Sequence, residues 1–393
     1  MMNKLFVSSY FRSINHYGEE LCGDKVEILF NNNSFVAVLA DGLGSGVKAN
    51  ILATLTSKII SEMVIADFSI DEIVETISKT LPECRERKVA YCTFTIIQIF
   101  NHGLCRLVEF DNPETIILRN NQILELEKHE YSIGNRLIKE VAFESRADDI
   151  FVFFSDGVIN ASSTSVLNLN WNLSSIKDFL LKYTRKSDSV KEINRLLLAN
   201  VFNLYQGIAQ DDVTCCVLKV INKTKSCVMV GPPLDSSNDK ETVRRLLECD
   251  GNKIVCGGTT SNIVARELAE TITTDINQDD NSLPPISYIK GIDLVTEGVI
   301  TLKKVNDLLK ACLKDDDYKE SLLNSKLENG AISMVKIFIN DCSEILFLVG
   351  QANNTVHNSL TYTAINLESK LRLINEIATS LKSLGKIVMV EKN

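Results

Sequence analysis

Histidine is scarce in this chain, and its cysteines form none of the common metal-binding patterns. The four histidines lie far apart, and none has the spacing of a zinc-ligand pair: His16, His102, His129 and His357. The eleven cysteines include no C-x-x-C pair, and their scatter through apolar runs suits a reducing compartment. These absences argue against zinc chemistry and against a Ser-His-Asp hydrolase.

Long apolar runs are also lacking. No stretch approaches the roughly 18 uninterrupted apolar residues of a membrane span, and residues 1–14 lack the apolar core of a signal peptide. The net charge of -9 disfavours a general affinity for nucleic acid or for an anionic membrane surface. We therefore expect a cytoplasmic protein with no nucleic-acid or membrane partner, in which a local site can still bind a phosphoprotein.

The length and the apolar content predict two globular domains. The chain has 393 residues, of which 45% are hydrophobic, and this is ample for two cores. We place the first domain at 1–222, where short β-like runs surround long helical patterns and predict an α+β fold. The strand-like runs are Lys25–Phe30, Phe35–Ala40, Tyr91–Phe100, Cys105–Phe110, Ile150–Phe154 and Val213–Val220.

Two long helices are predicted in this domain, at Val47–Ala66 and Ser189–Leu204. Ser45 is in the position of an N-cap for the first of them. The large apolar residues of the first helix fall on one face, which we expect to be buried. They are Val47, Ile51, Leu52, Leu55, Ile59, Ile60 and Met63.

A short polar linker is predicted at 221–226, followed by a second domain at 227–393. Strand-like and helix-like runs alternate in it, which predicts a smaller α/β domain. Glycines and threonines at 257–260 lie between a strand and a helix; they can form an anion site, and a plain β-to-α turn is the alternative. The paired runs are Cys227–Val230 with Asp239–Glu248, Lys253–Cys256 with Ser261–Thr273, and Ile292–Val295 with Leu302–Leu313.

The most informative stretch is the junction at which the apolar run Phe35–Ala40 leads into Asp41 and a glycine-rich segment, 42–46. A carboxylate at a strand end followed by glycines can fix a hard cation or a phosphate, but Asp-Gly after a strand is also a common tight turn. Asp24 precedes the previous strand-like run, and the asparagines at 31–33 predict a turn between the two. Antiparallel pairing would bring Asp24 and Asp41 together at the end opposite the turn.

Two further strand ends carry aspartates. Asp156 follows the run Ile150–Phe154, and Asp211 and Asp212 open the run that ends at Val220. Aspartates at four strand ends predict one all-oxygen cluster. Each also has a plainer interpretation: Asp24 as a turn residue, Asp156 as a helix N-cap, and Asp211 and Asp212 as solvated flanks of a strand.

Other polar residues near these motifs receive structural interpretations. Ser155 has no histidine near it in sequence, so we interpret it as a hydrogen-bonding residue rather than a nucleophile. Arg12, upstream of Asp24, is interpreted as a surface residue, and Asp148 and Asp149 as a solvated turn before a strand.

Three motifs in order resemble those of the metal-dependent protein phosphatase 2C (PPM) superfamily. The motifs are Asp41-Gly42-Leu43-Gly44-Ser45-Gly46, Phe154-Ser155-Asp156-Gly157-Val158 and Asp211-Asp212-Val213-Thr214. The branch that the chain resembles is the stage II sporulation protein E type of bacterial serine phosphatase, which also has a Gly-Asp at the position of Gly23-Asp24. The resemblance covers Leu5 to Val220, and the chain carries an additional C-terminal domain.

This resemblance implies a central β-sandwich flanked by helices, with two divalent cations, Mn²⁺ or Mg²⁺, at one end. Asp41 would bridge both ions, and Asp24 would bind one of them directly or through water. The Gly42 carbonyl would contribute to one site, and Asp156 and Asp211 would ligate the other ion. Asp212 would orient the loop, and the glycines after Asp41 would leave room for a metal-bound carbonyl and an incoming phosphate.

The implied activity is that of a protein serine/threonine phosphatase, in which a water activated by two metals attacks the phosphorus atom. Its partner would be a phosphorylated signalling protein, such as a switch protein of the anti-sigma antagonist kind. Two alternatives stay open: a catalytically silent phosphatase fold used as a binding module, and a ligand-responsive regulator centred on the C-terminal domain. That domain would bind a small molecule or a protein. The whole chain could form a homodimer.

Overall fold

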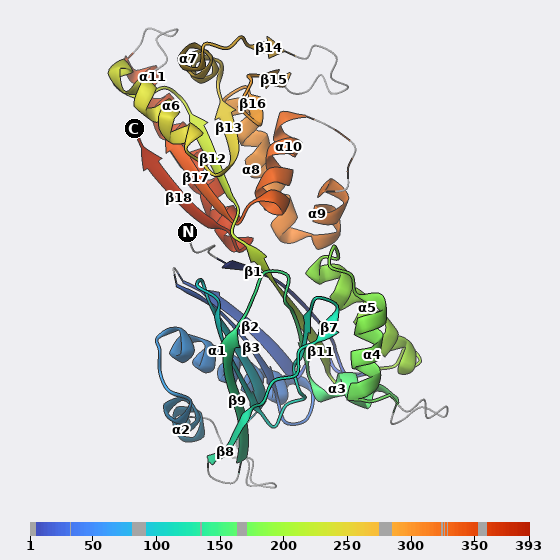
Figure 1. Cartoon of the computed structure of the whole chain (residues 1–393). Helices are drawn as coiled ribbons and strands as arrows, with labels where there is room; N and C mark the ends of the chain where they lie inside the picture. The colour runs from blue at the N-terminus through green and yellow to red at the C-terminus, as the bar shows by residue number, and fades with distance from the viewer. Residues whose placement is uncertain are drawn as a thin grey trace. The chain divides into compact units, whose positions relative to one another are not determined.

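The computed structural model divides the chain into two compact units, Met1–Asn222 and Lys223–Asn393 (Figure 1). The residues that it describes are 5–31, 33–80, 92–133, 136–162, 171–274, 285–323, 325, 327, 329–352 and 360–393. The predicted start of one strand at Tyr91 and the middle of the asparagine turn at Asn32 lie outside these residues. Each unit is considered by itself.

The first unit is a sandwich of two antiparallel sheets. One sheet has the strand order β2-β3-β4-β5-β9-β8, and the other has β1-β11-β10-β6-β7. A core of apolar residues from both sheets lies between them and includes Val26, Leu39, Leu107, Phe151 and Leu218. The strands are β1 (Leu5–Ile14), β2 (Asp24–Phe30), β3 (Ser34–Asp41), β4 (Thr93–Phe100), β5 (Leu104–Phe110), β6 (Ile116–Arg119), β7 (Gln122–Ile123), β8 (His129–Ile133), β9 (Arg136–Glu144), β10 (Ile150–Phe154) and β11 (Val213–Asn222).

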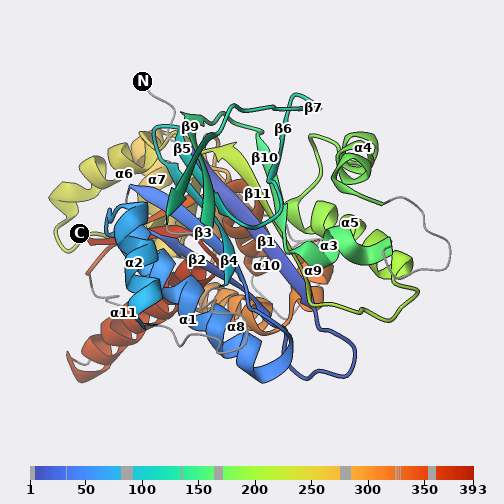
Figure 2. The same ribbon diagram turned by 90° about the horizontal axis from the view of Figure 1, so that it is seen from below.

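Helices cover both outer faces of the sandwich, with α1 and α2 on one side of the strands and α4 and α5 on the other (Figure 2). Since β3 is covered on both faces, it is apolar along its length rather than alternating. The predicted α+β sandwich flanked by helices is confirmed. The helices are α1 (Gly46–Ile65), α2 (Ile70–Thr80), α3 (Asp156–Ile159), α4 (Leu173–Tyr183), α5 (Val190–Leu204) and the 3₁₀ turn Asn160–Ser162.

The predicted orientation of α1 is wrong for its first turns only, since Ile60 is buried and Leu52, Ile59 and Met63 pack against the core. Its large residues Val47, Ile51 and Leu55 are 56%, 55% and 46% exposed, whereas Ala49 and Ala53 are buried. Small residues let the helix axis approach β2 and β3 closely, and this leaves the bulkier stripe on the outer side. Ser45 is the N-cap residue, as predicted, although its side chain makes no capping hydrogen bond.

The second unit is built on a mostly parallel sheet with the order β14-β15-β16-β13-β12-β17-β18. The strands β16, β13, β12, β17 and β18 are parallel, and β14 and β15 add an antiparallel edge. The predicted smaller α/β domain is therefore confirmed. The strands are β12 (Lys225–Val230), β13 (Gly251–Cys256), β14 (Thr273–Thr274), β15 (Ser287–Tyr288), β16 (Leu294–Thr296), β17 (Glu344–Val349) and β18 (Ile387–Lys392).

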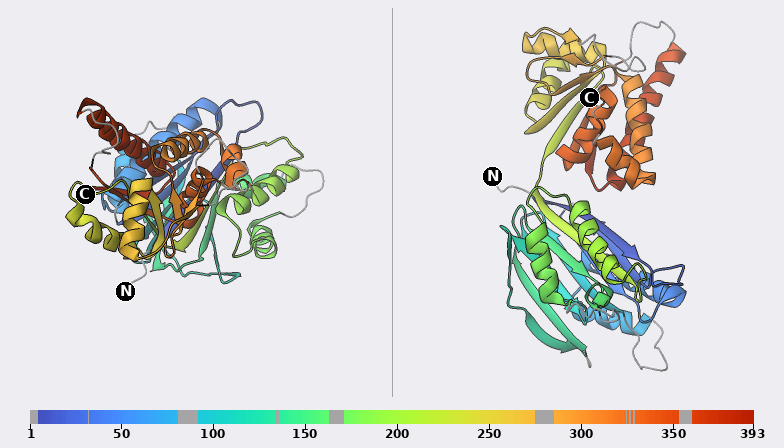
Figure 3. Two further views of the ribbon diagram at one scale, coloured as in Figure 1. Left: turned by 90° about the horizontal axis from the view of Figure 1, so that it is seen from above. Right: turned by 90° about the vertical axis from the view of Figure 1, so that its right-hand side faces the viewer.

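Helices pack on both faces of this sheet, as the right-hand view of Figure 3 shows. Residues of α6 and α7 pack on one face, and those of α8, α10 and α11 on the other. The helices are α6 (Asp239–Leu247), α7 (Gly258–Leu268), α8 (Val299–Lys314), α9 (Asp316–Leu323), α10 (Gly330–Lys336) and α11 (Leu360–Ser383), with a 3₁₀ turn at Ser236–Asn238 and a π-helical turn at Ile337–Asp341. In the part of the chain that the structure describes, no helix is both long and apolar enough to cross a membrane.

Candidate metal centre

The hairpin of β2 and β3 brings two carboxylates together. Asp24 is the first residue of β2, Asp41 is the last residue of β3, and the two are directly paired across the ladder. At the other end, the side chain of Asn31 accepts hydrogen bonds from the backbone N–H groups of Asn33 and Ser34, both at 2.8 Å. The predicted hairpin and the predicted proximity of Asp24 to Asp41 are confirmed.

The second sheet supplies the other acids at the same end of the sandwich. Phe154 at the end of β10 pairs with Cys215 near the start of β11, so Asp156 and Asp211 flank neighbouring strand ends. The Ser155 hydroxyl donates to Asp24 Oδ2 at 2.7 Å and accepts from the Thr214 backbone N–H at 2.9 Å. Ser155 therefore links the two sheets through the hydrogen-bonding role that the sequence predicts.

The four acids all have raised pKa values, and desolvation is the first cause for each. The pKa of Asp41 lies well above its ordinary value, first because the carboxyl is desolvated and then because Asp24, Asp156 and Asp211 are close to it. Burial also raises the pKa of Asp24, which is only 3% exposed, although the hydrogen bond from Ser155 opposes this shift. Desolvation raises the pKa values of Asp156 and Asp211 in the same way. Such excess negative charge in one place favours a cation.

The donor atoms at this end of the sandwich suit hard divalent cations. Asp24 Oδ1 and Asp212 Oδ2 are buried and have no hydrogen-bond partner among the described residues. Carboxylate and carbonyl oxygens are the ligands that Mg²⁺ and Mn²⁺ prefer. Within the described residues, however, no three His, Cys, Asp or Glu side chains converge closely enough to hold an ion as they stand. The residue types fit the cations, and side-chain rotation would be needed to complete a coordination shell.

Gly42 is explained by helix packing. A Cβ at this position would lie 2.4 Å from the Ala49 carbonyl oxygen, and the Gly42 N–H donates to the Gly23 carbonyl at 3.1 Å. The side on which Gly42 lacks a Cβ thus faces α1, not an incoming phosphate. Gly44 differs, because its φ is +90° and nothing lies within 4 Å of where a Cβ would stand. Open space therefore lies beside the backbone at Gly44, whereas α1 fills that side of Gly42, and the predicted roles of the glycines toward a ligand stay a prediction.

Several supporting residues escaped the sequence analysis. Asn50 Nδ2 donates to the Cys22 carbonyl at 2.8 Å, and the Tyr205 hydroxyl donates to the Gly157 carbonyl at 2.8 Å. The backbone N–H of His16 donates to Asp212 Oδ1 at 3.0 Å and holds the loop before Asp24; the resemblance implies the loop-orienting role of Asp212 but not this partner. A polar Asn50 just inside an apolar helix was the available signal for the first of these contacts.

Arg12 and Asp149 are both interpreted from the sequence as solvent-exposed, and the structure places them differently. Arg12 is exposed on β1, where it pairs opposite Cys215. The interpretation of Asp149 as a solvated turn residue is wrong: it is 1% exposed, and Arg119 binds both of its carboxylate oxygens, at 2.8 and 2.6 Å. A buried carboxylate requires such a partner, and Arg119 is distant in sequence.

In the second unit, the glycines and threonines at 257–260 directly follow β13. Residues 257–260 form the start of α7, where Ser261 Oγ donates back to the Gly257 carbonyl at 2.9 Å.

The strand order reverses between β12 and β17, where Gly231 and Gly350 follow the two strands. At this point Lys370 Nζ donates to the Gly350 carbonyl. Burial lowers the pKa of Lys370, and no carboxylate of the described residues forms an ion pair with it.

Comparisons with known proteins concern the first unit. A profile of the family described as Stage II sporulation protein E (SpoIIE) matches residues 31–221. Stage II sporulation protein E of Bacillus subtilis (strain 168) is 23% identical over 231 residues, which are 57% of this chain and 27% of that protein. The chain therefore spans about a quarter of the length of this curated relative.

Among solved structures, the phosphatase domain of SpoIIE from Bacillus subtilis with a fragment of its regulatory domain has a TM-score of 0.47 and 19% identity. The match covers 56% of this chain and 65% of that one. RsbX in complex with magnesium has a TM-score of 0.40 and 18% identity, over 55% of this chain and 95% of that one.

Proposed function

We propose that this protein is a metal-dependent protein serine/threonine phosphatase, because residues 31–221 match the profile of the Stage II sporulation protein E family. The observation that carries the proposal is the direct pairing of Asp24 with Asp41 at the end of the sandwich where Asp156 and Asp211 also lie. The raised pKa values of the four acids, caused first by desolvation, support it, since buried carboxylates close together are stabilised by cations.

Each acid has a proposed role in holding two divalent cations, Mn²⁺ or Mg²⁺. Asp41 would hold both ions, and Asp24 would hold one of them directly or through water. The Gly42 carbonyl would contribute to one site, and Asp156 and Asp211 would hold the other ion. When bound, the cations supply activation of the attacking water and neutralisation of the phosphoryl charge. Ser155 fixes Asp24 through Oδ2 and leaves the unpartnered Oδ1 for a ligand.

The proposed substrate is a phosphoserine or phosphothreonine on a signalling protein. With no protein nucleophile assigned, water attacks the phosphorus atom and the serine or threonine oxygen leaves as an alcohol once it has taken up a proton. The anti-sigma antagonist kind of switch protein is proposed by analogy with the family alone.

Hydrolysis of an aryl phosphate and of phosphoserine peptides, with Mn²⁺, Mg²⁺ or chelator, tests this function. We expect Asp41→Ala to lower kcat/KM by at least about 100-fold, because roughly 3 kcal/mol of transition-state stabilisation depends on the cations. Asp178→Ala is the matched control, since Asp178 is exposed on α4. Turnover that persists in chelator, or that Asp41→Ala leaves unchanged, would overturn the two-metal proposal.

A silent binding module is the second candidate, because the chain is only 23% identical to its curated relative, and a phosphatase fold can persist without activity at such divergence. Under this proposal the first unit binds a phosphorylated partner without hydrolysing it. Co-purification of the intact phosphoprotein with the wild type, and no phosphate release with either cation, would support the module. Release of phosphate would exclude it.

The second unit is proposed to be the sensory part of the protein. Open parallel sheets bind ligands beyond the carboxyl ends of their strands, where the strand order reverses. Here that point lies between β12 and β17, and it holds the Lys370 ammonium without a carboxylate partner among the described residues. A thermal-shift screen of nucleotides and phosphorylated metabolites on wild type and Lys370→Met tests the proposal. It fails if no compound shifts the wild type, or if Lys370→Met responds equally.

A further inference from the structure

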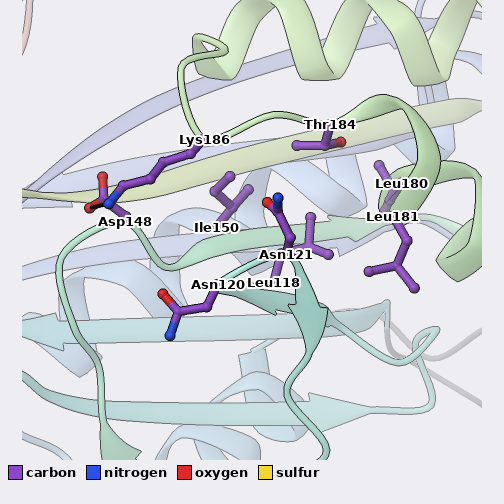
Figure 4. Close-up of a pocket in the computed structure, with 9 residues that line it drawn as sticks. All are labelled: Leu118, Asn120, Asn121, Asp148, Ile150, Leu180, Leu181, Thr184 and Lys186. Atoms are coloured by element: carbon purple, nitrogen blue, oxygen red, sulfur yellow. Dashed lines mark ion pairs between the residues drawn. The ribbon is translucent and has the colours of Figure 1, made fainter.

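A pocket of about 190 Å³ lies on the outer face of the second sheet in the first unit, beside the end of α4 (Figure 4). It opens where β10 begins at Ile150, whereas Asp156 follows the opposite end of the same strand. The proposed metal centre does not use this pocket.

The pocket has an apolar wall. Leu118, Ile150 and Leu180 line it and are buried, and Leu181 beside them stays 39% exposed. In Figure 4, Leu180 and Leu181 occupy the right-hand side. An apolar group of a ligand would cover this surface and remove it from water.

Two opposite charges stand at the other side of the pocket. Lys186 Nζ lies 2.9 Å from Asp148 Oδ2, and the pair is drawn at the left of Figure 4. The side chains are 69% and 37% exposed, so each can exchange its partner for a ligand at little cost. Hydrogen bonds fix the backbone at both residues. The Asp148 N–H donates to the Val220 carbonyl, and the Lys186 carbonyl accepts from Lys219 Nζ.

Neutral polar groups without protein partners complete the lining. Asn120 and Asn121 form the turn between β6 and β7, at φ +52° and +59°, and their side-chain amides make no hydrogen bond within the described residues. Thr184 is only 8% exposed, and its hydroxyl has no hydrogen-bond partner in the part of the chain that the structure describes. Donors and acceptors are thus available next to both the charged and the apolar parts.

We propose that this pocket binds a free α-amino acid with an apolar side chain, of the size of leucine. The ammonium group pairs with Asp148 and the carboxylate with Lys186, while the side chain lies against Leu180 and Leu181. Asn120 and Asn121 bond to the polar head. The paired charges match a zwitterion, and the apolar wall lies on the side away from them.

Size and charge exclude other common ligands. The volume is below the roughly 300 Å³ at which drug-sized pockets begin, which is too small for a nucleotide. The lining contains one cation, already paired with Asp148, and a phosphate group would need more. A fatty acid would leave the Asp148 carboxylate facing a second carboxylate.

Calorimetric titration of the full chain with L-leucine, in chelator and without phosphoprotein, tests the proposal independently of phosphatase activity. We expect saturable binding, weakened at least about 10-fold for 4-methylpentanoate, which lacks the ammonium group, and for glycine, which lacks the side chain. No heat of binding from L-leucine, L-isoleucine, L-methionine or L-phenylalanine up to about 10 mM would overturn the proposal.

Variants locate the site. Lys186→Gln and Asp148→Asn should each weaken L-leucine binding at least about 10-fold, and Asn tolerates the positive φ of +71° at Asp148. Leu181→Trp, at an exposed position, should block the pocket without unfolding the domain. Lys182→Gln, on the same helix but not in the lining, should bind like the wild type. Wild-type affinity for L-leucine in Lys186→Gln, Asp148→Asn and Leu181→Trp would place the amino acid elsewhere and overturn the proposal.

Discussion

At the scale of single residues, the candidate centre depends on how one serine connects two sheets. The Ser155 hydroxyl donates to Asp24 and so fixes one of its carboxylate oxygens. The same hydroxyl accepts from the Thr214 N–H, which gives this buried backbone donor a partner. Asp212 fixes the loop before Asp24 in a similar way, because its carboxylate accepts the His16 N–H. These neighbours orient acids that would otherwise repel one another.

Ser155→Ala should lower both metal affinity and stability. We expect Mn²⁺ affinity to fall roughly 10- to 100-fold, as for other residues that orient ligands, and the free energy of unfolding to fall by about 1–3 kcal/mol because the Thr214 N–H loses its acceptor. Calorimetric Mn²⁺ titration and urea denaturation measure the two effects. Ser174→Ala, at an exposed position on α4, is the control. Wild-type Mn²⁺ affinity in Ser155→Ala would show that Asp24 needs no such support.

At the scale of elements, α1 departs most from its sequence pattern. The stripe of Val47, Ile51 and Leu55 has helical spacing, and such spacing normally identifies the buried face. The face that packs on β2 and β3 carries Ala49 and Ala53 instead, because Gly23 and Gly42 leave space there for a close helix. The small residues of the strand ends and of the helix therefore determine its rotation.

Two substitutions in α1 distinguish the two faces. Ala53→Leu should lower the free energy of unfolding by about 1–3 kcal/mol through overpacking, because Ala53 is fully buried. Ile51→Gln should change it by less than about 0.5 kcal/mol, because Ile51 is exposed and glutamine is a good helix former. Urea denaturation of both variants is the measurement. A larger loss from Ile51→Gln than from Ala53→Leu would mean that the helix is rotated.

At the scale of the whole molecule, two different sheet architectures share one chain. The first unit places its acids at one end of an antiparallel sandwich, and the second has a parallel sheet with a reversal of strand order. A cluster of acids with raised pKa values makes the stability of the whole first unit depend on protons and cations.

In chelator, the first unit should lose stability as the pH rises from about 5 to about 8. The folded state raises the pKa of Asp24, Asp41, Asp156 and Asp211 above the unfolded value near 3.9. Their stabilising contribution is complete below that value and is lost as the pH rises through the folded pKa values. Thermal midpoints with and without Mn²⁺ measure this loss, which the cation should offset most at the upper end of the range.

Asp41→Asn provides the control, because it removes one charge from the cluster and nearly preserves the side-chain shape. Its thermal midpoint in chelator should fall less over the same pH range than that of the wild type. An equal or steeper fall would show that the pH dependence arises elsewhere in the chain.

The sequence alone was sufficient for the features that depend on local order. Alternation, turn residues and strand ends predicted the β2–β3 hairpin, the pairing of Asp24 with Asp41 and the two fold classes, because these follow from neighbours along the chain. The ligand roles of the acids stay a prediction. Only the tertiary structure decided the rotation of α1, the burial of Asp149 against Arg119 and the pocket at Lys186. Each of these depends on side-chain volume and charge brought together from distant segments, which no local pattern encodes.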